Sequence, residues 1–353
     1  MQRLKRMDGL RGVLAIYVML GHALPLTCVP GWVAAPFRHG EAAVDIFFAL
    51  SGLVIANSLK RFGPFMAARA WRLLPVYFLV LAFSIWVMAL GDPLAALPWA
   101  GADSRAIVSP GLPVPLLPHL AAHLLLLHGL IPQSVLPYSY VTLLGPAWSL
   151  STEWQFYVLI GLITPKHLGR FALALLAVGA SYRSLPLAGE FSRAFLPDAA
   201  PFFALGLASA VYLRGGGSRA FWLCLFGACA LGFLTGPEKA LTPLAWGLVL
   251  LAQRHSWGAV LESRMAQYLG AISYPLYLVN EPVQRALALL LAGRGEMAFT
   301  ALFLPLSLAL ALLAAAGLHH GIERPFMRRN KPRVAALRGI GADAFTIGSA
   351  RRF

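Results

Sequence analysis

The sequence predicts an all-α fold, a polytopic integral membrane bundle of about ten transmembrane helices with both termini in the cytoplasm. Hydrophobic residues make up 59% of the chain and charged residues only 12%, and the mean hydropathy is +0.70. A soluble domain carries about twice this share of charged residues. The apolar residues also gather into long stretches that polar or proline-rich segments separate, as transmembrane helices require.

Several of the apolar stretches are shorter than the roughly 20 residues that a straight crossing needs, so the number of spans is approximate. The ten predicted spans are residues 12–29, 41–58, 73–90, 146–164, 171–187, 199–213, 220–235, 240–253, 267–291 and 297–319. With the N-terminus in the cytoplasm, 22 of the 29 Lys and Arg residues fall in cytoplasmic segments and seven in or near outer segments. The positive-inside rule therefore accounts for the net charge of +15, and no nucleic-acid partner is needed to explain it.

The first span places three chemically active side chains on one helix face. Successive residues turn by about 100°, so Arg11 and His22 lie within roughly 20° of each other, and Asp8 lies about 40° from His22. The rise of about 1.5 Å per residue places His22 roughly 16 Å deeper than Arg11. Charged and imidazole groups are costly inside a membrane and mark functional sites. The alternative is a histidine that merely bonds a neighbouring helix.

The second span carries Asp45 near its outer end and Ser51-Gly52 at mid-span. A carboxylate at this depth needs a partner, so we expect Asp45 to orient other groups. Gly52 permits close approach of another helix, and Ser51 can donate a hydrogen bond across that approach. The simpler interpretation of Ser51 and Gly52 is a packing seam.

Two arginines precede the third span. Arg69 and Arg72 are three residues apart and therefore share a helix face at the membrane mouth. Two guanidinium groups there suit a phosphate, which arginine binds bidentately. The alternative is a topological anchor or a contact with lipid headgroups.

Residues 91–145 form the longest segment outside the predicted spans and are rich in proline. Within it, residues 119–131 predict a helix too short to span, lying at the interface or re-entering the membrane. On that helix His119 and His123 share a face, whereas His128 lies about 180° from His119. The three histidines therefore do not converge on one metal ion, and we predict no metal site.

The fourth span carries a polar stripe. Ser149, Glu153 and Tyr157 follow an i, i+4, i+8 spacing on an otherwise apolar helix. An intramembrane glutamate with flanking hydroxyl groups is a candidate site residue. The alternative for Glu153 is an ion pair with an arginine of another span. Later in the chain, Pro275 and Pro282 of the ninth span are expected to break regular helix bonding and mark a cavity.

Six blocks of the chain together resemble the membrane-bound acyltransferase 3 family of bacterial O-acyltransferases, in its stand-alone form. They occur in family order and reach from residue 8 to residue 325. The blocks are Asp8-Gly-Leu-Arg11-Gly with His22, Val-Asp45-Ile-Phe-Phe-Ala-Leu-Ser-Gly52, Arg69-Ala-Trp-Arg72-Leu-Leu-Pro75, Trp148-Ser-Leu-Ser-Thr-Glu153 with Tyr157, Ser273-Tyr-Pro-Leu-Tyr277, and Glu323-Arg-Pro325. One position departs from the family pattern, since Asn280 stands where the family usually has a histidine.

The resemblance implies transfer of an acyl group, usually from acetyl-CoA, to a hydroxyl of a sugar, polysaccharide or lipid-linked glycan at the bacterial inner membrane. An alcohol attacks a thioester poorly without a base, so we expect His22 to act as general base or acyl relay. Asp8 and Arg11 are expected to line the cytoplasmic opening of this site.

The remaining assignments rest on helix spacing. Arg69 and Arg72, with Arg11, are expected to bind the anionic acyl-CoA. Glu153 is expected to orient His22 or the acceptor hydroxyl, and Ser149 and Tyr157 to polarise the thioester carbonyl.

The expected partners are the lipid bilayer and a carbohydrate acceptor. We assign residues 1–333 to the transmembrane domain and expect residues 334–353 to be a disordered cytoplasmic tail. A proton-coupled secondary transporter is the competing function, since it too uses buried ionisable groups and proline-broken helices. The chain shows no repeat between its halves, which disfavours that alternative.

Overall fold

The computed structural model describes residues 4–59, 61–100, 111–255 and 257–328, and every regular element in these ranges is helical. The expected tail at 334–353 lies outside them. Ten helices of 14 residues or more match the ten predicted spans one for one. They are α1 (Lys5–Ala23), α3 (Gly40–Ile55), α4 (Phe62–Leu90), α7 (Ala147–Ile163), α8 (Leu168–Arg183), α9 (Leu196–Leu213), α10 (Arg219–Thr235), α11 (Leu241–Arg254), α12 (Arg264–Leu290) and α13 (Glu296–Leu318).

Four of these regions are long and apolar enough to cross a membrane by length and composition alone. They are Lys5–Leu26, Phe62–Ala95, Leu196–Leu213 and Glu296–Arg328, and Arg219–Thr235 is apolar but shorter. The all-helical fold is therefore confirmed. The number of ten transmembrane helices and the cytoplasmic position of both termini stay predictions.

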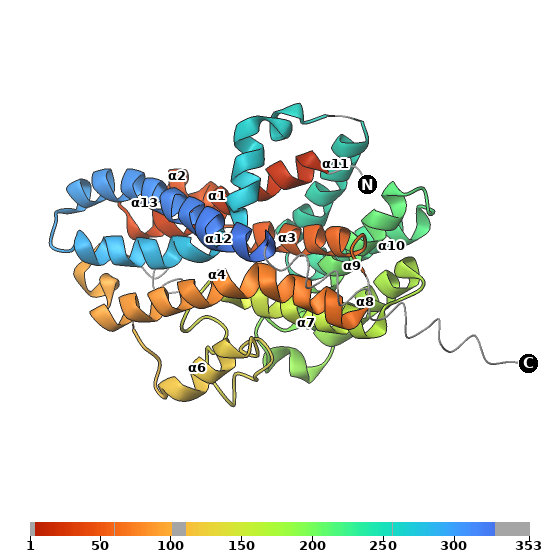
Figure 1. Cartoon of the computed structure of the whole chain (residues 1–353), viewed down its shortest axis with the longest axis horizontal. Coiled ribbons are helices and arrows are strands. Elements are labelled where there is room, and N and C mark those ends of the chain that lie inside the picture. Colours follow the sequence, from red (N-terminus) through yellow and green to blue (C-terminus); the bar gives the residue numbers. More distant parts are fainter. Residues whose placement is uncertain (1–3, 60, 101–110, 256, 329–353) are drawn as a thin grey trace, which may run out of the picture.

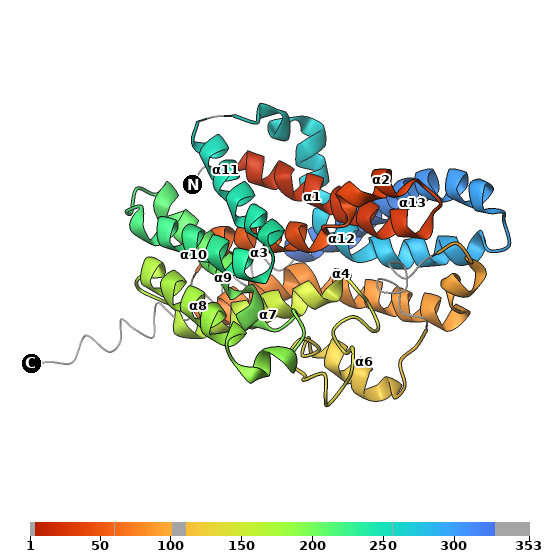
Figure 2. The same ribbon diagram turned by 180° about the vertical axis from the view of Figure 1, so that it is seen from behind.

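Two of the most extensive helix pairs in the bundle are α1 with α12 and α3 with α9 (Figures 1 and 2). At the first, a Cβ atom on Gly12 would lie 2.6 Å from the backbone nitrogen of Gly270, and one on Gly270 would overlap the carbonyl oxygen of Asp8. At the second, a Cβ atom on Gly52 would lie 2.5 Å from the carbonyl oxygen of Phe203. Backbones approach this closely only where side chains are absent, so the packing seam predicted at Gly52 is confirmed.

Helix α12 continues through both of its prolines. The sequence led us to expect broken helix bonding at Pro275 and Pro282, but one helix runs from Arg264 to Leu290. Sixteen of its residues are buried, including the run from Pro275 to Ala288 apart from one position. Neighbouring helices enclose the segment and hold it helical in spite of the missing amide protons.

The histidine-bearing helix is shorter than expected. Instead of a helix over 119–131, α6 spans Leu116–Leu124, and the chain then turns through Leu126, whose φ is +58°. This turn carries His128 back over α6, where its ring stacks on His123 with centroids 4.1 Å apart. The expectation that His128 faces away was wrong because it assumed an uninterrupted helix. Within the described ranges, no group of three or more His, Cys, Asp or Glu side chains is arranged to hold a metal ion.

Candidate functional site

The predicted donor-binding residues come together from three helices. Arg11 of α1 lies within electrostatic range of Arg72 on α4, of Glu153 and Tyr157 on α7, and of Asp8. Arg69 of α4 lies within range of Tyr157, Arg72 and Glu153. We call Arg11, Arg69 and Arg72 the arginine cluster. The structure therefore brings six sequence-predicted residues into one neighbourhood, although they are up to about 150 positions apart in the chain.

The arginines of the cluster are held by few protein partners. Arg69 donates a hydrogen bond of 2.7 Å to Ser58 Oγ, and its guanidinium carbon lies 5.6 Å from the centre of the Tyr157 ring. Arg72 Nε is 3.6 Å from a carboxylate oxygen of Glu323, whose other oxygen lies 2.7 Å from His319 Nδ1.

The Nε atoms of Arg11 and Arg72 are buried, and neither has a hydrogen-bond partner among the described residues. Buried donors of this kind are costly when they stay unpaired. The arrangement is suited to accept an anion with several oxygen atoms, because guanidinium groups bind such anions in bidentate fashion.

His22 pairs with the residue that departs from the family pattern. His22 Nδ1 lies 2.9 Å from Asn280 Oδ1 on α12. The other end of the Asn280 amide donates to two backbone carbonyls, at 3.1 Å to Leu276 and 2.6 Å to Tyr277. Because these donations fix Oδ1 as the acceptor, His22 carries its proton on Nδ1 and presents the Nε2 lone pair. In this tautomer Nε2 can accept a hydrogen bond or a proton.

The polar stripe of α7 divides between the two ends of the site. Ser149 lies near the His22 end, where its hydroxyl is 3.0 Å from that of Tyr277 and 3.2 Å from the carbonyl of Pro146. Tyr157, about 12 Å further along the helix axis, has its hydroxyl 3.3 Å from Ser51 Oγ, beside Arg69. Each hydroxyl therefore has a different set of neighbours.

Glu153 lies between these ends. It is within electrostatic range of Tyr277 on one side and of Arg11 and Arg69 on the other. Among the described residues, no hydrogen bond joins Glu153 to His22, whose partner is Asn280. The carboxylate of Glu153 is therefore nearer in charge interaction to the arginine cluster and to Tyr277 than to His22.

Sequence reasoning missed several partners and one cavity. Tyr277 and Glu323 stood in quoted motifs, but nothing in the pattern indicated that Tyr277 would pair with Ser149 or Glu323 with Arg72. Arg193 gave no signal at all, since it lies in a loop before α9. In the structure it forms ion pairs with Glu41 and Asp45, which supplies the partner that Asp45 was expected to need.

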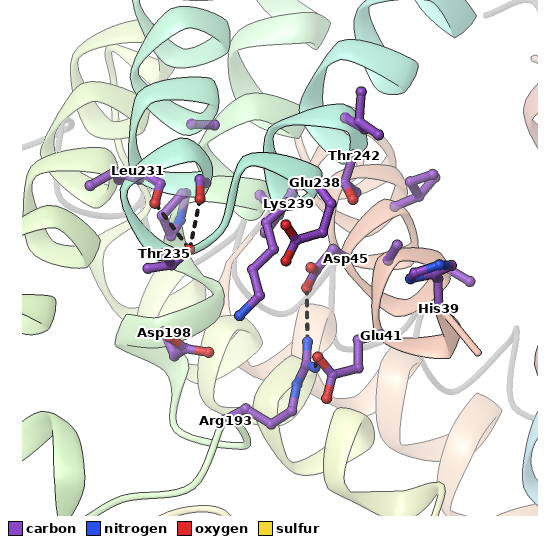
Figure 3. Close-up of a pocket in the computed structure, with 18 of the residues that line it drawn as sticks. His39, Glu41, Asp45, Arg193, Asp198, Leu231, Thr235, Glu238, Lys239 and Thr242 are labelled. Atoms are coloured by element: carbon purple, nitrogen blue, oxygen red, sulfur yellow. Dashed lines mark hydrogen bonds and ion pairs between the residues drawn. The ribbon is translucent and has the colours of Figure 1, made fainter. Parts of the chain in front are cut away.

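A cavity of about 920 Å³ opens around these ion pairs (Figure 3). It lies where α1 nears its end and where α3, α9 and α11 begin, which is the His22 end of the bundle. Neither the arginine cluster nor His22 lines it.

Comparison with known proteins gives a family and two relatives. Residues 4–316 match the model of a family described as an acyltransferase domain. The chain is 28% identical over 339 residues to the exopolysaccharide production protein ExoZ of Rhizobium meliloti (strain 1021), a match that covers 87% of this chain and 96% of the relative. It is 32% identical over 166 residues to protein 2 in the picA locus of Rhizobium radiobacter, which covers 43% of this chain and 78% of that protein. No solved structure matches the chain.

The family model covers all but the first few residues and the last segment of the chain, and it includes five of the six motifs described above. The arginine cluster and the His22–Asn280 pair both lie within the matched range. The chain belongs to the acyltransferase 3 family and is an acyltransferase.

Proposed function

We propose that the protein is an O-acyltransferase of the bacterial inner membrane. It transfers an acyl group, in the first instance acetyl, from cytoplasmic acyl-CoA to a hydroxyl of a polysaccharide or of a lipid-linked glycan. The family match supports acyl transfer. The likeness to a protein named for exopolysaccharide production supports a polysaccharide acceptor.

The arginine cluster is the proposed donor site. Acyl-CoA presents several phosphate groups, and Arg11, Arg69 and Arg72 offer guanidinium groups. The buried Nε atoms of Arg11 and Arg72 have no hydrogen-bond partner among the described residues. Phosphates accept such donors in charge-assisted hydrogen bonds, which are about twice as strong as neutral ones. From here the thioester at the end of the long pantetheine arm extends past Glu153 toward His22, a separation of roughly 16 Å along α1.

His22 is the proposed general base. Its Nε2 lone pair removes the proton from the acceptor hydroxyl while the hydroxyl oxygen attacks the thioester carbonyl. The carbon–sulfur bond then breaks, the CoA thiolate takes up the proton from the imidazolium, and the products are the ester and free CoA.

The Tyr277 hydroxyl is the proposed donor to the transient oxyanion. The single proton of Ser149 has two acceptors within reach, the carbonyl of Pro146 and the Tyr277 hydroxyl. When Ser149 donates to Tyr277, the proton of Tyr277 is available to a substrate oxygen.

The observation that carries the proposal is the pairing of His22 with Asn280 at a fixed depth below the arginine cluster, in which two buried Nε donors have no hydrogen-bond partner among the described residues. A base with a defined tautomer and an anion site on the same helix are what a two-substrate acyl transfer needs. The family match sets aside the alternative of a proton-coupled transporter.

The test is acyl-CoA binding and turnover by the full chain in nanodiscs. Wild type should bind acetyl-CoA and slowly release free thiol. Replacing Arg69 and Arg72 together by Gln should weaken binding about a hundredfold, because each lost charge-assisted bond is worth roughly 1.5 kcal/mol. Arg170→Gln, an exposed arginine at the same end of the bundle, is the matched control and should bind as wild type does.

The outcomes separate the two roles. His22→Ala should still bind acetyl-CoA but release no thiol above the uncatalysed rate. If the double arginine variant binds as tightly as wild type, the donor site lies elsewhere. If wild type has no affinity for any acyl-CoA, the proposed donor is wrong and other acyl carriers must be assayed.

A further inference from the structure

The cavity at the His22 end is lined by residues to which the proposed mechanism gives no role. They come from α1, α3, α8, α9, α10 and α11, from the loop between α8 and α9, and from the turn before α11. Figure 3 shows Lys239, Glu238, Asp198 and Arg193 pointing into a common space. At about 920 Å³ it is near the upper end of the range for ligand sites.

The charges around the cavity are balanced. Four carboxylates and four cationic side chains line it, namely Glu41, Asp45, Asp198, Glu238, Arg38, Arg183, Arg193 and Lys239. Some are paired with each other, since Arg193 pairs with Glu41 and Asp45, and Arg183 lies 3.7 Å from Asp198. Glu238 and Lys239 have no ion pair or side-chain hydrogen bond among the described residues, so their polar ends are available to a ligand.

A continuous chain of contacts joins this cavity to His22. The guanidinium carbon of Arg193 lies 4.7 Å above the ring of Trp148, the residue before Ser149. Ser149 bonds to Tyr277, whose carbonyl accepts from Asn280. Asn280 in turn holds His22. Four residues, Trp148, Ser149, Tyr277 and Asn280, therefore link Arg193 of the cavity wall to the proposed base.

We propose that this cavity binds the acceptor and that the acceptor segment it binds is an uncharged saccharide. A ligand with a net charge is favoured by a site of one sign, whereas here acids and bases are equal in number. Sugar hydroxyls both donate and accept, so they can bond to carboxylates and to guanidinium groups alike. Tyr17 and Phe191 add aromatic surface to the lining, which suits the apolar faces of sugar rings.

This inference rests on the proposed function, but its test reads saccharide binding without acyl transfer. Hydrogen–deuterium exchange is measured on the full chain in nanodiscs, with neutral gluco- and galacto-oligosaccharides or with oligogalacturonates of matched length. Neutral oligosaccharides should slow exchange in segments 184–195 and 236–242, and the acidic series should do so much less. Protection that appears without acyl-CoA supports the cavity even if the donor proposal fails.

Variants locate the binding. Glu238→Gln and Lys239→Gln change exposed side chains and should leave folding intact, yet each should weaken the saccharide-dependent protection about fivefold, the effect of one lost hydrogen bond. Arg193→Lys, which removes the bidentate group, should weaken it further. Arg294→Gln, an exposed arginine in the loop after α12, is the control and should bind saccharide as wild type does.

Three results would overturn the inference. These are no protection of either segment by any neutral oligosaccharide, equal protection by the acidic series, or unchanged protection in the Glu238 and Lys239 variants. If protection is unchanged in the Glu238 and Lys239 variants while the enzyme still transfers acyl groups, the proposed function stands and the acceptor binds elsewhere.

Discussion

Replacing Asn280 by Leu tests whether the tautomer of His22 governs turnover. Leucine has nearly the same size and shape but cannot accept the proton of His22 Nδ1, which in wild type is bonded to Asn280 Oδ1 at 2.9 Å. The site is buried, since Asn280 has no exposed surface. An unpaired buried donor costs about 1–3 kcal/mol, which favours the other tautomer, with the proton on Nε2 and no base facing the substrate.

The expected loss follows from that energy. A shift of about 1.4 kcal/mol is tenfold, so kcat should fall about tenfold to a hundredfold. The KM for acyl-CoA should stay near wild type because the arginine cluster is untouched. The assay is acetyl transfer or thiol release by the purified variant in nanodiscs, with thermal unfolding followed in parallel.

Gln284→Leu is the matched control. Gln284 lies one turn further along α12, is equally buried, and also bonds to α1, donating 3.0 Å to the carbonyl of Met19. It should lower the unfolding temperature as Asn280→Leu does but leave kcat close to wild type. A folded Asn280→Leu variant with wild-type kcat would refute the assignment of His22 as a base with a fixed tautomer.

Two further predictions concern stability. Gly270→Ala should lower the free energy of unfolding by about 1–3 kcal/mol, because its methyl group would overlap the Asp8 carbonyl. The control is Gly317→Ala, where an added methyl group would meet no atom within 4 Å, and this variant should be neutral or slightly stabilising. Equal unfolding temperatures of the two variants would contradict the close crossing of α1 and α12. Burial lowers the pKa of His128 to about 4. As the pH falls, the unfolded chain therefore binds a proton at this histidine before the folded chain does. The contribution of the neutral, buried His128 to the free energy of unfolding is complete above about pH 6.5 and decreases by about 3 kcal/mol toward pH 4. His128→Phe, which keeps the stack on His123, should flatten this acid dependence in thermal unfolding scans, and an unchanged pH slope would exclude His128 as its source.

The sequence by itself determined where the long helices lie and which polar residues of α7 share one helix face. Hydropathy and proline position are local properties, so eight of the ten long helices could be placed to within a few residues at both ends. The exceptions are α1, which begins and ends about six residues earlier than the first predicted span, and α4, which begins at Phe62 instead of residue 73. The spacing of Ser149, Glu153 and Tyr157 likewise follows from helix geometry alone. Arg69 and Arg72 were correctly placed together because only three residues separate them.

Only the tertiary structure decided which of these faces meet. Asn280 lies 258 residues from His22, and no periodicity could pair them; the close crossing of α1 and α12 at Gly12 and Gly270 does so. The cavity around Arg193 likewise needs six helices and the loop before α9 to converge. Helix formation depends on neighbours within one turn, whereas the partners of a buried polar group depend on which backbones can approach, and that is settled when the whole bundle packs.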